Sequence, residues 1–282
     1  MANADKLLKS AQKKMKKGLP ILGKRDYPGA IQDLKKAEIE FKRAKDFASL
    51  AVCYSMLADC YEGEDQLFMA GSAVSNAIEA KVRATPDAIA TMVPQLKSMG
   101  ERAVDCYRSD GRHDAAADVY SRVAEHIAPS NLDAATGILL DAFEIMKVED
   151  RLKSGIQFLK KAALLFMKHG EYDQAIETFN EAIEVYGQIR QNHNISKSVL
   201  ALVLIHLKRG DLDSANSVVA EHAQYIGNDE GQVIDKLLMA FQTKDPELLE
   251  QARDMHILKV VDAECFQLSR KLFVQAEADD VL

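Results

Sequence analysis

Hydrophobic positions recur along this chain at fixed offsets. From an aromatic or aliphatic start, further apolar residues follow at +3, +7, +10 and +14, as in Tyr172, Ala175, Phe179, Ala182 and Tyr186. At about 3.6 residues per turn these offsets fall on one face of an α-helix, so each copy predicts a helix with one buried stripe. Small and large residues alternate along the stripe, which lets neighbouring helices pack closely.

The copies begin roughly 20 residues apart, a spacing typical of stacked helices. Helix starts are predicted at residues 27, 47, 67, 89, 113, 132, 152, 172 and 212, and a start near 192–195 would complete the series. The copy from His113 drifts after Tyr120, and Pro94 is expected to kink the helix from Ile89 or delay its start. Glycines typical of helix stops and turns stand between the periodic stretches: Gly18, Gly23, Gly111, Gly170, Gly210 and Gly227.

Two such helices form a unit of about 40 residues, longer than the roughly 34 of a tetratricopeptide repeat. We predict an all-α, right-handed superhelix of tetratricopeptide-like antiparallel helix pairs. The period fades near the C-terminal end, where short helices are expected at about 230–242, 246–256 and 261–273. The expected domains are a helical-repeat body, 1–227, and a C-terminal helical bundle with an acidic tail, 228–282. Such scaffolds usually bind other proteins.

The motifs of common enzyme classes are missing from the sequence. It contains no glycine-rich phosphate loop, no Gly-x-Ser-x-Gly and no His-Glu-x-x-His. His206 stands in an apolar stretch, where a packed imidazole with a backbone partner is expected. Cys53, Cys60, Cys106 and Cys265 are interpreted as small buried hydrophobes in a reducing compartment. We therefore predict a protein that is not an enzyme, with no catalytic residue, metal or cofactor.

The charge is unevenly distributed. The formal net charge is −7, which argues against a nucleic-acid partner, yet residues 1–45 hold thirteen Lys or Arg against five Asp or Glu. This basic segment is either a solvated helix face or a patch that meets an anionic membrane. The N-terminus lacks a signal-peptide core, and the longest apolar run, Val199–Ile205, is too short to span a bilayer. A cytoplasmic protein with at most peripheral membrane contact is expected.

An apolar loop follows the basic first helix. Leu19, Ile21 and Leu22 lie between two glycines, and Lys24 and Arg25 follow them. Loops are usually polar, so these side chains either pack onto the first helix pair or insert shallowly into a membrane. In the second case Lys24 and Arg25 would meet lipid phosphates.

Two further segments are candidates for binding. The acidic tail, with Asp279, Asp280, Val281 and Leu282, is either a frayed end or a recognition segment in which carboxylates steer and an aliphatic side chain anchors. A set of basic positions begins around residue 151 and provides either ordinary solubility or a positive groove for an acidic helical bundle. It comprises Arg151, Lys153, Lys160, Lys161, Lys168, Lys197, Lys208 and Arg209.

The order of these parts resembles the soluble NSF attachment proteins, the SNAP family. The strongest local similarities are Phe41 to Phe47, Gly111 to Glu125 and Glu171 to Ala182, and the resemblance covers nearly the whole chain. The segment from Asp26 to Ala30 fits as well. The stretch from Val203 to Asp211 resembles the gamma type more closely than the alpha type.

The resemblance implies an adaptor in vesicle transport and membrane fusion. Such a protein binds SNARE complexes of the syntaxin type and recruits and stimulates the hexameric ATPase NSF, with no cofactor of its own. It implies SNARE contacts at Lys153, Lys160, Lys161 and Lys197, and membrane attachment through the loop. ATPase contacts would fall on Asp279, Asp280, Val281 and Leu282.

Two departures from the alpha type are visible. Asp118 and Ile156 stand where that type carries SNARE-gripping lysines. The family tail often carries an aliphatic residue next to last, and here Val281 holds that place, with a further aliphatic residue, Leu282, after it. The competing interpretation is a general tetratricopeptide-like interaction scaffold unrelated to SNAREs.

Overall fold

The computed structural model of the protein describes residues 2–16 and 25–274. Every secondary-structure element of these residues is a helix. The chain divides into two compact units, Met1–Gly155 and Ile156–Leu282, and the division falls within helix α8 (Leu152–His169). The predicted all-α fold class is confirmed.

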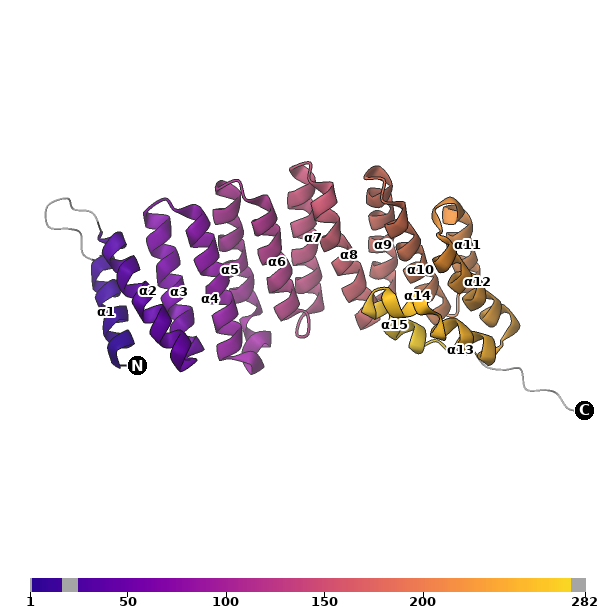
Figure 1. The fold of residues 1–282 in the computed structure, drawn as a ribbon, viewed down its shortest axis with the longest axis horizontal. Helices are drawn as coiled ribbons and strands as arrows, with labels where there is room; N and C mark the ends of the chain where they lie inside the picture. The colour runs from indigo at the N-terminus through magenta and orange to yellow at the C-terminus, as the bar shows by residue number, and fades with distance from the viewer. Residues whose placement is uncertain (1, 17–24, 275–282) are drawn as a thin grey trace, which may run out of the picture. The chain divides into compact units, whose positions relative to one another are not determined.

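The first unit is a series of antiparallel helices in which each packs against its neighbours in sequence (Figure 1). Its elements are α1 (Ala2–Lys16), α2 (Tyr27–Ala44), α3 (Phe47–Gly63), α4 (Leu67–Ala84), the 3₁₀ turn η1 (Pro86–Ala88), α5 (Ile89–Ser109), α6 (His113–Ile127) and α7 (Leu132–Val148). Lys14 holds α1 to α2, since its ammonium donates to Asp33 at 2.7 Å and to the Gly29 carbonyl at 3.2 Å.

The second unit begins with similar antiparallel helices and ends in shorter ones. Its elements after α8 are α9 (Tyr172–Gln188), α10 (Asn192–Lys208), α11 (Leu212–His222), the 3₁₀ turn η2 (Ala223–Tyr225), α12 (Asn228–Thr243), α13 (Pro246–Asp254), α14 (His256–Val260) and α15 (Ala263–Arg270). Helices α12 to α15 contact one another, and α15 also packs on α10. The predicted short helices at about 230–242, 246–256 and 261–273 correspond to α12, α13 and α15. The sequence did not predict α14, a separate short helix between α13 and α15.

The predicted starts coincide with the observed helices from α2 to α11. The expected start near 192–195 is also found, at Asn192. The stripe explains this agreement, because its positions are the buried ones: Ala30, Leu34, Ala37 and Phe41 of α2 are at most 1% exposed.

Two details of the stripe differ from the sequence interpretation. The copy in α6 does not drift, since Val123 and Ile127 continue it at +10 and +14 and both are buried. In α5 the buried face runs through Val93, Leu96, Gly100, Ala103 and Tyr107. Counted from Val93, these positions follow the offsets +3, +7, +10 and +14. The buried stripe of α5 therefore begins at Val93, next to Pro94, although the helix itself already begins at Ile89.

Helix α10 is buried on nearly every side. All residues from Ile195 to Leu207 except Lys197 are buried, because α9, α11, α12 and α15 surround this helix. The stripe is present here too, at Ile195, Val199, Leu202 and His206. It was hidden in the sequence because the other faces are also apolar.

The turns between helices share one geometry. Gly111, Gly170 and Gly210 have positive φ, as the helix-stop interpretation requires, whereas Gly227 has a φ of −71° and is the N-cap residue of α12. Gly18 and Gly23 lie outside the described residues. The carbonyl at the last stripe position accepts the N–H that opens the next helix, as in Gln191 N to Tyr186 O at 2.9 Å. Five turns put a non-glycine residue in the same region, and periodicity alone did not identify them: Lys45, Asp65, Asp150, Arg190 and Lys244.

The four cysteines are free and buried, as predicted. Burial raises the pKa of the Cys53 and Cys60 thiols to about 12, so these thiols stay protonated at neutral pH. In the described residues no helix is both long enough and apolar enough to cross a bilayer.

Candidate protein-interaction site

The four lysines predicted to contact a partner lie in different settings. Lys153 is exposed near the start of α8, in the first unit. Lys160 and Lys161 are half-buried further along α8, and Lys197 is half-buried on α10, all in the second unit. The structure therefore places Lys160, Lys161 and Lys197 in one compact body and leaves Lys153 in the other.

Lys160 has a partner inside the protein. Its ammonium lies 2.7 Å from Oδ1 of Asp262, and about a quarter of each side chain is exposed. Asp262 is the N-cap residue of α15, where the positive end of the helix dipole favours a carboxylate. The ion pair thus attaches the last helix of the bundle to α8.

The groups around this ion pair are shielded from water. Burial, together with the Asp262 charge, raises the pKa of Tyr186 to about 12. Burial and Asp262 also raise the pKa of the Cys265 thiol, and Lys160 partly opposes this effect. Because the surroundings are poorly hydrated, the attraction between Lys160 and Asp262 is weakly screened.

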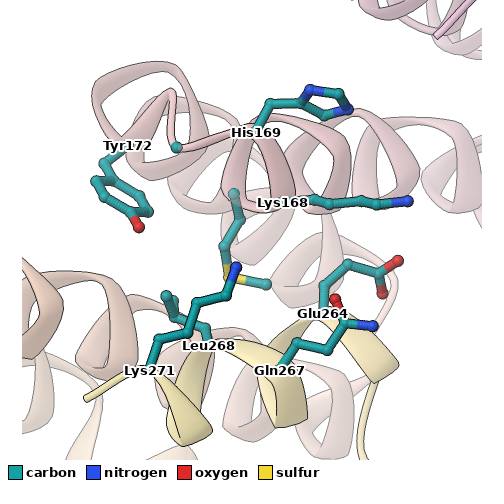
Figure 2. Close-up of a pocket in the computed structure, with 9 residues that line it drawn as sticks. Lys168, His169, Tyr172, Glu264, Gln267, Leu268 and Lys271 are labelled. Carbon is teal, nitrogen blue, oxygen red and sulfur yellow. The ribbon is translucent and has the colours of Figure 1, made fainter. Parts of the chain in front are cut away.

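A cleft of about 180 Å³ lies between the end of α8 and α15 (Figure 2). Its floor is apolar, with Met167 3% exposed and Leu268 4% exposed. Gly170 and polar side chains form the rest of the lining, the polar ones being Lys168, His169, Tyr172, Glu264, Gln267 and Lys271. The combination of a small apolar floor and a polar rim suits one side chain or a short peptide stretch.

The rim of this cleft is predominantly basic. Lys271 extends from α15 towards α8 (Figure 2), and Lys208 donates to the Lys271 carbonyl at 3.0 Å, which brings another ammonium group to the same helix end. Glu264 supplies a carboxylate. Within the described residues, neither Lys168 nor Lys271 forms a side-chain ion pair.

Two nearby arginines, unlike Lys168 and Lys271, form ion pairs within the described part of the protein. Arg209 pairs with Asp173 at 2.6 Å. Arg270, next to Lys271 in sequence, pairs with Glu250 at 3.3 Å and with Asp254 at 3.0 Å, which joins α15 to α13. The structure therefore separates the cations that build the bundle from those that remain available at the cleft.

The sequence identified only part of this cleft. Lys168 and Lys208 were among the basic positions, but Glu264, Gln267 and Lys271 were not singled out. The spacing of positions 264, 267, 268 and 271 places them on one helix face, which was a usable signal. What the sequence did not contain is the packing of that face against the end of α8.

A second cleft of about 430 Å³ lies at the other end of the chain, in the first unit. It is lined by Gln12, Met15, Lys16, Arg25 and Met56. Its lining thus combines two thioethers with two cationic side chains.

Most of the predicted loop and tail residues fall outside the described part of the chain. This applies to Leu19, Ile21, Leu22 and Lys24, and to Asp279, Asp280, Val281 and Leu282. Arg25 is described. It is exposed and donates through Nη1 to the Tyr27 hydroxyl at 3.0 Å.

No catalytic constellation stands out in the described residues. No group of three His, Cys, Asp or Glu side chains there could hold a metal ion. Among the described residues, the buried side-chain polar atoms without a hydrogen-bond partner are Nδ1 of His113, Nδ1 of His206 and Oε1 of Glu230, which come from different helices. His206 is packed as expected, 9% exposed, but its Nδ1 lacks the backbone partner that the sequence interpretation included.

Successive antiparallel helix hairpins and a basic cleft are typical of helical-repeat proteins that bind other proteins. The sequence model of the family described as soluble NSF attachment protein, SNAP, matches residues 2–254. The chain belongs to this family, which confirms the resemblance seen in its sequence.

A curated relative agrees with this assignment. The chain is 23% identical over 264 residues to the gamma-soluble NSF attachment protein of Dictyostelium discoideum, a match that covers 90% of this chain and 78% of that protein. This similarity to a gamma-type member agrees with the gamma-type resemblance seen in the sequence from Val203 to Asp211.

Solved structures show only distant likeness. Aspartyl phosphate phosphatase F from Bacillus subtilis is 16% identical with a TM-score of 0.41, over 91% of this chain and 59% of that one, so the chain spans less than two thirds of that structure. A Rap protein complexed with competence and sporulation factor is 14% identical with a TM-score of 0.33, over 96% of this chain and 73% of that one. Likeness at this level says nothing about function.

Proposed function

We propose that this protein is an adaptor that binds SNARE complexes of the syntaxin type and recruits and stimulates the NSF ATPase for their disassembly. Membership of the SNAP family over residues 2–254 carries the proposal, supported by the gamma-type relative. In this role the protein binds and positions its partners, and ATP hydrolysis belongs to the ATPase. We place it in the cytoplasm, peripherally attached to membranes.

The packing of the helices suits an adaptor that transmits force. Each hairpin buries a stripe of alternating small and large residues, and packed interiors of this kind deform little under load. Ion pairs connect helices that are not adjacent in sequence, as where Arg102 of α5 meets Glu62 of α3 at 2.8 Å. Such cross-links resist the sliding of one helix past another.

The proposed SNARE surface is the set of basic side chains on α8 and α10. Lys161 and Lys197 share the second unit with Lys160, which already pairs with Asp262. Positive charge on this face would steer an acidic helical bundle towards the protein. Lys153, exposed at the start of α8, completes the proposed set.

The proposed membrane contact is the N-terminal end. The α1 helix carries the exposed Lys6, Lys9 and Lys13. The cleft with Met15 includes Lys16 and Arg25, which in sequence directly flank the segment that bears Leu19, Ile21 and Leu22. Cations beside apolar side chains favour the interface of an anionic bilayer.

The proposed ATPase contact lies at the opposite end of the sequence. We propose the same division as the sequence suggested, with residues 1–227 as the repeat body and residues 228–282 as the C-terminal bundle and tail. Asp279 and Asp280 would steer the tail to a basic surface, with Val281 and Leu282 as apolar anchors.

The test is a three-component pull-down. Immobilised, preassembled SNARE complex is incubated with the ATPase in the presence or absence of this protein. We expect the ATPase to be recovered only when the protein is present, and the SNARE complex to come apart once Mg²⁺ and ATP are added. A folded protein that fails to bind the assembled complex would favour the general interaction scaffold instead.

A further inference from the structure

The cleft between the end of α8 and α15 carries charge for which no partner is found in the described chain. Lys168 and Lys271 are at its rim, with Lys208 close to Lys271, against one carboxylate, Glu264. Both Lys168 and Lys271 stand at the C-terminal ends of helices, where a cation also favours the helix dipole. That role does not account for the apolar floor between them, formed by Met167 and Leu268.

An occupant that fits this lining needs carboxylates next to aliphatic side chains. The chain contains one such stretch close by. Residues 277–282 read Glu-Ala-Asp-Asp-Val-Leu, with three carboxylates followed by two aliphatic side chains. The stretch begins six positions after Lys271, which itself lines the cleft.

We propose that this cleft binds the chain's own acidic segment, residues 277–282. Lys168 and Lys271 pair with the carboxylates, and an aliphatic side chain covers Met167 and Leu268. The segment held in this way is withheld from other partners until one of them displaces it.

The length of the chain permits this contact. Asp279 lies eight residues beyond Lys271, and an extended chain covers up to about 3.3–3.6 Å per residue. Neighbouring helices lie only about 8–10 Å apart, so the segment can return along the cleft with residues to spare.

The tether also makes a weak contact sufficient. Exposed ion pairs are individually modest, but a segment joined by a short linker has an effective concentration in the millimolar range. Occupancy within one chain is therefore favoured over occupancy by the segment of a second copy.

That the docked segment is withheld from the ATPase rests on the proposed function, because the same segment is the proposed ATPase contact. The docking itself is independent of the proposed function, since its test requires neither SNAREs nor the ATPase. Failure of the docking would leave the adaptor proposal intact, and failure of the adaptor proposal would leave the docking measurable.

The test is zero-length carbodiimide cross-linking of the full chain, with the linked peptides identified by mass spectrometry. We expect Lys168 or Lys271 joined to Glu277, Asp279 or Asp280. The yield should be independent of protein concentration and should fall as salt is raised.

Two variants make the result specific. Replacing Val281 and Leu282 with Ser keeps every amine and carboxylate that the carbodiimide couples and removes the aliphatic side chains that cover Met167 and Leu268, so the tail cross-links to Lys168 and Lys271 should fall by about five-fold or more. The matched control is Lys259→Gln, on the exposed side of α14 in the same unit, and should leave the yield unchanged.

Three outcomes would overturn the proposal. They are tail carboxylates that couple evenly to Lys259 and other exposed lysines, cross-links that form only between chains and rise with concentration, and the complete absence of tail cross-links.

Discussion

Lys160 of α8 and Asp262 at the start of α15 form an ion pair of 2.7 Å that attaches the C-terminal bundle to a repeat helix. The residues are far apart in sequence, and three quarters of each side chain is covered. The pair therefore gives Lys160 a structural role, whatever it contributes to binding a partner.

The first prediction concerns the stability provided by this pair. Lys160→Gln should lower the free energy of unfolding by about 1–2 kcal/mol, since a partly buried charge-assisted hydrogen bond is lost. Urea denaturation measures the change, and a double-mutant cycle with Asp262→Asn isolates the coupling. The exposed Lys259→Gln should stay within about 0.5 kcal/mol. A zero coupling energy would show that the two groups act independently.

The same pair separates structural from binding effects. Asp262→Asn keeps the Lys160 charge and releases it, so SNARE binding should be retained or strengthened if Lys160 contacts the partner directly. Lys160→Gln should weaken that binding. Equal losses in both variants would mean that Lys160 acts only by holding the bundle in place.

The second prediction concerns a close approach of two helices. A Cβ atom at Gly155 of α8 would lie 2.7 Å from Cβ of Met146 in α7, and neither atom can move without its backbone. Gly155→Ala should therefore destabilise the first unit by about 1–3 kcal/mol, despite the higher helix propensity of alanine. Thermal and urea unfolding measure the effect.

Gly187 of α9 is the matched control for Gly155. Nothing lies within 4 Å of the position of its Cβ. Gly187→Ala should stabilise the protein by up to about 1 kcal/mol through reduced freedom of the unfolded chain. The prediction is wrong if both substitutions change stability in the same direction.

The third prediction concerns pH. His206 occupies the +14 stripe position of α10, and burial lowers its pKa from 6.5, with Asp211 acting in the opposite direction. The unfolded chain therefore binds a proton at His206 more readily, so stability should fall as pH drops below 6.5.

His206→Met should reduce this loss, because Met fills the same stripe position in α7 without a titrating group. The slope contributed by one such histidine is at most about 1.4 kcal/mol per pH unit. Urea denaturation between pH 7 and pH 5 measures it, with the exposed His256→Gln as control. Identical slopes in His206→Met and the unaltered protein would exclude His206 as the cause.

The fourth prediction tests the membrane loop. Replacing Leu19, Ile21 and Leu22 with Ser should weaken binding to anionic liposomes at least ten-fold, since each apolar side chain contributes about 1.5–3 kcal/mol when buried. Flotation measures binding, and far-UV circular dichroism checks that helicity is kept. Ile39→Ser, at an exposed position of α2, should bind normally. Unchanged binding by the triple variant would assign these residues to packing on the first helix pair.

The fifth prediction tests the acidic tail. Deleting residues 279–282 should lower stimulation of the ATPase, because both the steering carboxylates and the apolar anchors are removed. Lys168→Gln with Lys271→Gln should have the opposite effect at low protein concentration, since it releases the tail from the cleft. Full stimulation by the deleted chain would remove the tail from the ATPase contact.

Local periodicity predicted most of the fold. The stripe from Tyr27 to Phe41 is a pattern within one helix, so it needs no knowledge of distant residues. Periodicity was not enough where neighbouring helices bury several faces of one helix, or where a helix is very short. Helix α10 looks irregular because four helices cover it, and α14 is too short to show a period.

The candidate site was less accessible from the sequence. Lys160 and Lys168 looked alike there, as basic positions flanking a stripe. In the folded chain Lys160 is paired with Asp262, whereas Lys168 lines a cleft with Lys271. Charge patterns show where cations are located along a helix, but not which carboxylate of another helix approaches them.

The sequence by itself determined the helices, their order, the buried stripe and the family resemblance, because each of these is written in short-range spacing or in local motifs. Only the tertiary structure decided which lysines build the bundle and which face solvent at a cleft. That choice depends on how the side of α15 with Leu268 packs against the end of α8, a contact between segments far apart along the chain.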